Sequence, residues 1–217
     1  MPSTDVILAG LSETANTYRW AAVAWHVLLS ALVVAFLAGW RLSTRVIAWF
    51  AVASILSVSA LSWASNLLFN GIAFAALAIV LAAAAMRTRQ VAIEFDRPWR
   101  IMPGAALVIL GWTYPHFLST ESWTEYLYAA PFGLVPCATL SVVIGLTLMI
   151  RNIGTAAWSA PLAAAGVLYG VVGVFVLHVL LDVGLLSGAL VLAVVIASVR
   201  ADATAPMMHT VARRGGV

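Results

Sequence analysis

Two groups of polar side chains interrupt an otherwise apolar sequence and are of types that could bind a ligand. One group lies in the stretch GWTYPHFLSTESWTEYLYAAPFG and contains His116, Glu121 and Glu125. The other is HVLLD, in which His178 and Asp182 are four residues apart and would share one face of a helix. Histidine and carboxylate side chains arranged in this way can share a proton or bind a metal ion together.

Further polar residues within or between the apolar runs extend this set of candidates. His26 lies inside the first apolar run, and Asn66 and Asn70 lie in a short polar break, SNLLFNG. Polar and ionisable side chains within a membrane usually face the protein interior, a partner or water. The candidate ligand-binding residues are therefore His26, Asn66, Asn70, His116, Glu121, Glu125, His178 and Asp182.

Each candidate also has a structural interpretation that requires no ligand. Asp182 directly precedes VGLL and a predicted helix, so its carboxylate is suited to accept backbone N–H bonds as an N-cap. His178 can be a hydrogen-bonded packing residue, and His26 can link two helices by a hydrogen bond. The segment Ser119–Tyr128 can be a connection on the membrane surface, because aromatic residues typical of that interface surround it. These are Trp112, Tyr114, Trp123, Tyr126 and Tyr128.

The composition defines the environment of the chain. Hydrophobic residues make up 64% of the sequence and charged residues only 9%, a balance far from that of a water-soluble domain. The net charge of +3 comes from arginines spread over the segments between apolar runs, which argues against nucleic acid as a partner. Cys137 is the single cysteine, so the chain cannot form an intramolecular disulfide.

The lengths of the apolar runs predict an all-α, polytopic transmembrane bundle of seven helices over residues 1–199. A helix needs roughly 20 apolar residues to cross the hydrocarbon core, so the two runs of about twice that length must each turn once. The first of these breaks at SNLLFNG and the second at LDVG. Residues 200–217 are predicted to form a disordered cytoplasmic tail. The apolar runs are Tyr18–Trp40, Val46–Met86, Ile101–Leu118, Leu134–Ile150 and Thr155–Ser198.

The arginines predict the orientation of this bundle. Arginines in short connections stay on the cytoplasmic side, and seven crossings with the N-terminus outside bring all of them but Arg19 to that side. The cytoplasmic set would be Arg41, Arg45, Arg87, Arg89, Arg97, Arg100, Arg151, Arg200, Arg213 and Arg214. In this orientation the candidate ligand-binding residues gather in the external half. The sequence therefore predicts a polar cavity that is open to the outside.

Three segments of the chain resemble a bacterial family of small multi-pass membrane proteins of unknown function. They begin at NTYRWAAVAWHV, at YLYAAPFGLVPCATL and at PLAAAGVLYGVV. In that family a Pro-x-Pro-Thr-like element opens a late helix and an Asp-x-Gly-Leu-Leu element opens the last one. Asp182 and Gly184 match the second element, whereas Pro136 and Thr139 match parts of the first, with Ala138 in place of its second proline. The resemblance implies a fold but no activity.

Two classes of function follow from these patterns, together with a third that needs no site. The first is a small-solute or ion permease or binding protein of the bacterial inner (plasma) membrane, favoured by the one-sided polar residues. The second is a membrane-embedded enzyme or metal-binding subunit, and the third is an accessory subunit of a larger membrane complex. No nucleotide or protease motif is present, and haem attachment has no Cys-x-x-Cys-His motif, so no cofactor and no metal is predicted. The expected partners are the lipid bilayer and a small molecule or ion.

Overall fold

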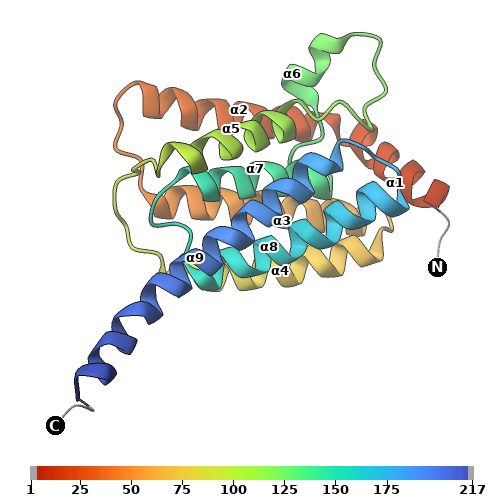
Figure 1. Cartoon of the computed structure of the whole chain (residues 1–217). Helices are drawn as coiled ribbons and strands as arrows, with labels where there is room; N and C mark the ends of the chain where they lie inside the picture. The colour runs from red at the N-terminus through yellow and green to blue at the C-terminus, as the bar shows by residue number, and fades with distance from the viewer. Residues whose placement is uncertain (1–3, 215–217) are drawn as a thin grey trace.

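The computed structural model describes residues 4–214, and for residues 200–214 it gives only the course of the helix. In this part of the chain every regular element is a helix or a helical turn, and there is no strand (Figure 1). Its elements are α1 (Thr4–Thr17), α2 (Arg19–Leu37), α3 (Thr44–Ala64), α4 (Leu68–Arg87), α5 (Pro98–Thr113), the 3₁₀ turn η1 (Trp123–Glu125), α6 (Tyr126–Ala129), α7 (Pro136–Met149), α8 (Ala156–Val171), the π-helical turn η2 (Val172–Val176) and α9 (Asp182–Arg214).

Five helices are long and apolar enough to cross a membrane. They are α2, α3, α4, α8 together with η2, and the part of α9 from Asp182 to Val199. Their outward surfaces carry large apolar side chains such as Val34, Ile79 and Val194, which are more than half exposed. Such surfaces are stable against lipid tails and are rarely this extensive on a soluble monomer. The protein therefore has the helices of a membrane protein.

The number of spans differs from the sequence prediction of seven. The apolar helices α5 and α7 contain 16 and 14 residues, which is shorter than the roughly 20 residues that a crossing needs. The predicted span Ile101–Leu118 is helical only as far as Thr113, because the backbone at Tyr114 is no longer helical. Length and composition thus identify five candidate spans in the described part of the chain, and the orientation of the termini stays a prediction.

Both predicted breaks in the double-length runs are present. At the first, α3 ends at Ala64 and α4 begins at Leu68, and Asn66 between them has a φ of 58°. Asparagine tolerates this left-handed conformation better than most residues, which explains its place in the turn. At the second, α8 ends in the π-helical turn η2, and His178 with a φ of 57° precedes the start of α9.

Helix α7 lies in the centre of the bundle, against α5, α3, α8 and α9 (Figure 1). Twelve of its residues are buried, including polar Thr139 and Ser141. It approaches α5 through small residues: a Cβ at Gly104 would lie 2.7 Å from the carbonyl oxygen of Gly145. Because protein rather than lipid surrounds α7, its backbone can leave the helix at either end without exposing polar groups to hydrocarbon.

Two segments differ from the sequence prediction in other ways. Residues 4–17 form the helix α1, which the sequence did not predict, and α1 contacts α2. At the other end of the chain, residues 200–214 continue α9 away from the bundle (Figure 1). The disordered tail predicted for residues 200–217 has no described side chains and stays a prediction, and residues 1–3 and 215–217 lie outside the described residues.

Candidate functional site

The carboxylate of Asp182 is buried where three helices meet. The residue is 1% exposed and stands at the start of α9. The Tyr114 hydroxyl, directly after α5, donates a hydrogen bond of 2.6 Å to Asp182 Oδ1. The Cys137 thiol, in the first turn of α7, donates one of 3.2 Å to Asp182 Oδ2. We refer to Tyr114, Cys137 and Asp182 as the Asp182 cluster.

Local backbone features at the ends of three helices build this cluster. Pro136 occupies the first turn of α7, where its missing N–H is not needed, and this places Cys137 at the helix start. Helix α8 widens at its end into η2. There the Val179 N–H donates a hydrogen bond of 2.8 Å to the Gly173 carbonyl oxygen. Gly173 must lack a side chain, because a Cβ there would overlap the Asp182 carboxylate. Such π-turns occur frequently at functional sites.

The structure does not support the interpretation of Asp182 as an N-cap. Its carboxylate oxygens accept their hydrogen bonds from Tyr114 and Cys137. The N–H groups of Val183 and Gly184 donate instead to the carbonyl oxygens of the preceding residues Leu180 and Leu181. The carboxylate therefore joins α9 to α5 and α7 rather than terminating α9.

A small cavity adjoins the cluster. It has a volume of roughly 90 Å³, and Cys137 lies in its wall together with Asn70 and Tyr169. Tyr169 donates a hydrogen bond of 3.0 Å from its hydroxyl to Asn70 Oδ1, so α4 and α8 are also joined at this end of the bundle. The rest of the wall is apolar, and it includes Ile7 and Leu11 of α1. Helix α1 therefore forms part of the wall of the cavity.

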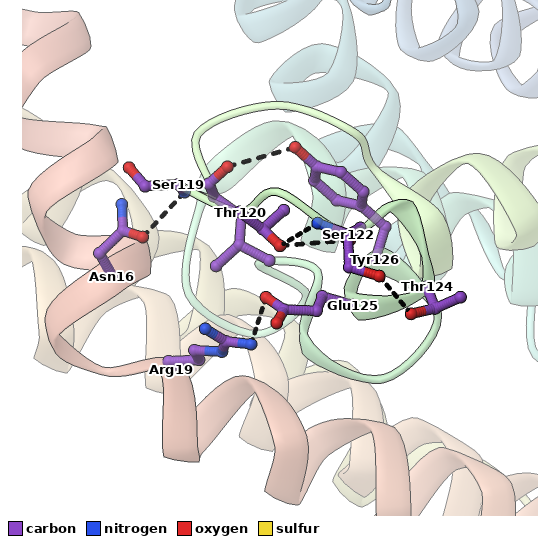
Figure 2. A network of polar contacts seen from close by, with 9 residues as sticks. Asn16, Arg19, Ser119, Thr120, Ser122, Thr124, Glu125 and Tyr126 are labelled. Atoms are coloured by element: carbon purple, nitrogen blue, oxygen red, sulfur yellow. Dashed lines mark hydrogen bonds and ion pairs between the residues drawn. The ribbon is translucent and has the colours of Figure 1, made fainter.

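Hydrogen bonds hold α1 to the connection between α5 and α7. Ser12 and Asn16 donate to the Phe117 carbonyl oxygen over 3.1 and 2.9 Å. The Ser119 N–H donates to Asn16 Oδ1 over 2.9 Å (Figure 2). Phe117 has a φ of 71°, which is unfavourable for an aromatic residue and is maintained by these bonds. Arg19 at the start of α2 forms an ion pair with Glu125 of the same connection (Figure 2).

Several candidates from the connection between α5 and α7 and from the turn before α9 are not brought together. Glu121 is exposed, and Glu125 is occupied by Arg19. His116 is half-buried with its ring 4.3 Å from that of Phe117. His178 is exposed in the turn before α9 and forms no hydrogen bond or ion pair with Asp182, since helical geometry does not continue between them. Neither of the two cavities described here is lined by any of these residues, and a common pocket for them stays a prediction.

The remaining candidates have separate positions. His26 is 2% exposed and links two helices, with Nδ1 2.8 Å from the Ala22 carbonyl oxygen and Nε2 2.9 Å from that of Trp112. Its interpretation as an interhelical hydrogen bond is thus confirmed. Asn66 is an exposed turn residue, whereas Asn70 lies in the cavity wall within α4. Whether any of these side chains binds a ligand stays a prediction.

Two tyrosines of this region were not among the candidates. Tyr114, assigned from the sequence to an interfacial aromatic belt, is 0% exposed, and that assignment is wrong for this residue. Tyr169 is likewise buried. A buried tyrosine hydroxyl normally requires a partner, so a tyrosine at the end of a predicted membrane helix is a signal that could have been used. The described residues contain no group of three or more His, Cys, Asp or Glu side chains able to hold a metal ion.

No protein-family model, no curated protein and no solved structure matches this chain. The resemblance to a bacterial family of multi-pass membrane proteins therefore stays a prediction, and no activity is transferred from a relative. Fold and site define an all-helical protein, with five helices suited to crossing a membrane and one deeply buried carboxylate at the end of one of them.

Proposed function

We propose that this protein is a multi-pass protein of the bacterial inner membrane that binds a small solute or ion as a permease or binding protein, with Asp182 as the central residue of the site. One observation carries the proposal: a carboxylate, buried to 1% exposure at the start of a membrane-type helix, is bonded to two further protonatable groups. A carboxylate within a membrane is energetically costly and commonly belongs to an ion pathway or a proton relay.

The size of the adjoining cavity supports a small ligand. Its roughly 90 Å³ is well below the 300–1,000 Å³ that is typical of sites for drug-sized molecules. A proton or a small cation fits both this volume and the chemistry of a carboxylate with hydroxyl and thiol donors. Cys137 contributes to the cavity wall and also bonds Asp182, so it connects the cavity with the carboxylate. Helix α1, which forms part of the cavity wall, would cover the route from the cavity to the Asp182 carboxylate.

The proposal includes seven crossings with the N-terminus outside, and the charge distribution supports this. The connections that follow α2, α4 and α7 carry arginines, whereas the opposite connections do not. Helix α7 is shielded by its neighbours, so its 14 residues need not span lipid unaided. Cysteines introduced at exposed Ser122 and exposed Asn152 should react with a membrane-impermeant maleimide from opposite sides of the membrane. Labelling of both from one side would contradict the seven crossings.

The experiment that tests the function is ion flux into sealed vesicles. The purified protein is reconstituted, a potassium diffusion potential is applied with valinomycin, and internal pH and internal sodium are followed with two dyes. We expect the wild-type protein to carry one of these ions faster than protein-free vesicles. The Asp182→Asn variant should fall to the protein-free rate, because amides cannot take up a proton or balance a cation.

Two controls make the result interpretable. Glu121→Gln removes a carboxylate that is exposed and outside the cluster, so this variant should keep the wild-type rate. Cys137→Ser keeps a hydrogen-bond donor to Asp182 and tests whether a milder change alters the rate in a correctly folded protein. Equal flux in the wild type, Asp182→Asn and protein-free vesicles for both ions would contradict the proposed ion transport.

A further inference from the structure

A second and much larger cavity lies at the opposite end of the bundle from Asp182. Its volume is about 1040 Å³, and it is enclosed by the end of α4, the start of α5, the end of α7, the start of α8 and the middle of α9. The connection between α4 and α5 forms one wall. That connection is held in place by isolated β-bridges from Ala92 to Ser43 and from Phe95 to Ile150. The cavity is thus part of a defined structure and not a gap beside a loose loop.

The walls of this cavity carry an excess of positive charge. Asp96 is the acidic residue in the lining, and it already accepts a hydrogen bond of 2.8 Å from Arg100 Nη1 and one of 2.7 Å from the Arg97 backbone N–H. Arg151 lies 3.9 Å from Glu94, with both side chains largely exposed. Among the side chains that the structure describes, the three other arginines of the lining, Arg87, Arg89 and Arg97, have no ion-pair partner. The arginines of the lining are Arg87, Arg89, Arg97, Arg100 and Arg151.

Two buried polar atoms in the lining have no hydrogen-bond partner. Ser159 is 1% exposed and its Oγ is unsatisfied, as is the buried Nε of Arg100. Native proteins pair nearly all such atoms, and each exception calls for an explanation. The Arg100 guanidinium is otherwise well held, by Asp96 and by stacking 5.0 Å above the Trp99 ring. An acceptor bound in the cavity would satisfy Arg100, and a ligand oxygen or hydroxyl would satisfy Ser159.

Two helices begin at this cavity. Helix α5 begins at Pro98 and α8 at Ala156, and the residues before them, Arg97 and Thr155, form no side-chain cap. Pro98 has no N–H, and the Arg100 and Trp158 N–H groups already donate to the carbonyl oxygens of Arg97 and Thr155. The helix starts therefore contribute mainly the positive ends of their dipoles, which add to the charge of the arginines. This combination of uncapped helix starts and arginines is typical of sites for phosphate groups.

We propose that this cavity binds a phosphate group, and that the molecule carrying the phosphate also has an apolar part. Arginine side chains recognise phosphate oxygens through paired hydrogen bonds. The apolar part fits the opposite wall, which α9 supplies with Leu192, Val195 and Val199. An anionic phospholipid of the adjacent leaflet and a soluble organic phosphate both have this chemistry. The inference is independent of the proposed function at Asp182.

The test measures binding of defined phosphate compounds to the full-length protein. The protein is prepared in a zwitterionic detergent and titrated separately with phosphatidylglycerol, phosphatidylcholine and hexyl phosphate. Native mass spectrometry counts bound molecules and thermal unfolding gives the stabilisation. Bound phosphatidylglycerol that raises the unfolding temperature, without a comparable effect of phosphatidylcholine, supports a lipid phosphate. The same result for hexyl phosphate supports the site and assigns it to a soluble organic phosphate.

Matched variants locate the binding. Arg89→Gln and Arg97→Gln each remove an exposed charge from the cavity and should weaken binding about tenfold, as expected for a charge-assisted hydrogen bond. Arg41→Gln and Arg45→Gln remove exposed charges from the same end of the bundle outside the cavity, and should leave binding unchanged.

Ser159→Ala separates binding from folding. It deletes an unpaired buried hydroxyl, so the ligand-free unfolding temperature should stay the same or rise while ligand stabilisation decreases. Equal weakening by the Arg41 and Arg45 variants would show general attraction to a positive surface and would overturn the proposal. Absence of stabilisation by every phosphate compound would also overturn it.

Discussion

Gly173 lies directly against the carboxylate of Asp182, so closely that a single methyl group on Gly173 would overlap it. The two residues belong to consecutive elements, η2 and α9, and their contact determines how near α9 can come to the end of α8. The absent side chain at position 173 is therefore a condition for the bonds that Asp182 accepts from Tyr114 and Cys137.

Replacement of Gly173 by alanine should destabilise the protein. The added methyl group must displace either the carboxylate or the π-turn, and overpacking of this kind costs about 1–3 kcal/mol. Thermal unfolding in detergent, followed by tryptophan fluorescence, measures the loss. Gly154→Ala is the matched control, because a Cβ there meets the Ser159 hydroxyl at 3.4 Å and Thr147 atoms at 3.9 Å, which are ordinary contact distances. A Gly173→Ala protein as stable as the control would contradict the described contact.

The bond between Tyr114 and Asp182 should appear as an energetic coupling. A double-mutant cycle with Tyr114→Phe and Asp182→Ala isolates the pair. A hydrogen bond to an ionised carboxylate contributes about 1.5–3 kcal/mol and one to a neutral acid about 0.5–1.5 kcal/mol, so the coupling also reports the charge of Asp182. Trp158→Phe removes a buried bond to Thr147 near the other end of the bundle, and its effect should add to that of Asp182→Ala. A coupling near zero for Tyr114 would contradict the structure.

The sequence predicts the helical, membrane-type fold and both breaks in the long apolar runs, because these depend on local composition and length. It does not predict α1, since residues 4–17 mix polar and apolar side chains and never reach the length of a span. The partners of Asp182, Tyr114 and Cys137, lie 68 and 45 residues before it in the sequence, so only the packing of distant segments brings them to its carboxylate. Spacing along one helix favoured His178 as its partner, but the chain between these two residues is a turn.

His26 should stabilise the contact between α2 and α5. Substitution by phenylalanine retains a ring but loses the N–H bond from the imidazole to a carbonyl oxygen, that of Ala22 or of Trp112 according to the tautomer, which we expect to lower the free energy of unfolding by about 1 kcal/mol. Unfolding in mixed detergent measures this loss. His178→Asn serves as the control, since His178 is exposed and asparagine tolerates its positive φ. An equal effect of both substitutions would show that His26 has no special role.

Asn16 should keep α1 in place over the small cavity. Asn16→Ala removes the bonds to the Phe117 carbonyl oxygen and from the Ser119 N–H, each contributing about 1 kcal/mol. Hydrogen exchange at Ser119 and in α1 should therefore become about 5–30-fold faster. Arg19→Gln breaks only a partly exposed ion pair and should change exchange much less. If both variants exchange at the wild-type rate, α1 is held by its apolar contacts alone.

The central place of α7 has a consequence for the assembly of the bundle during synthesis. Helices leave the ribosome in chain order, so α2 to α5 are synthesised before α7. At that stage Gly104 and Gly111 of α5 have not yet met Gly145 and Ala138, their partners on α7. The helices α3 and α4 pack directly on each other and can pair early, whereas α5 lacks its main partner until α7 has been made. A ribosome stalled before Leu134 would therefore hold a chain in which α5 has not yet docked.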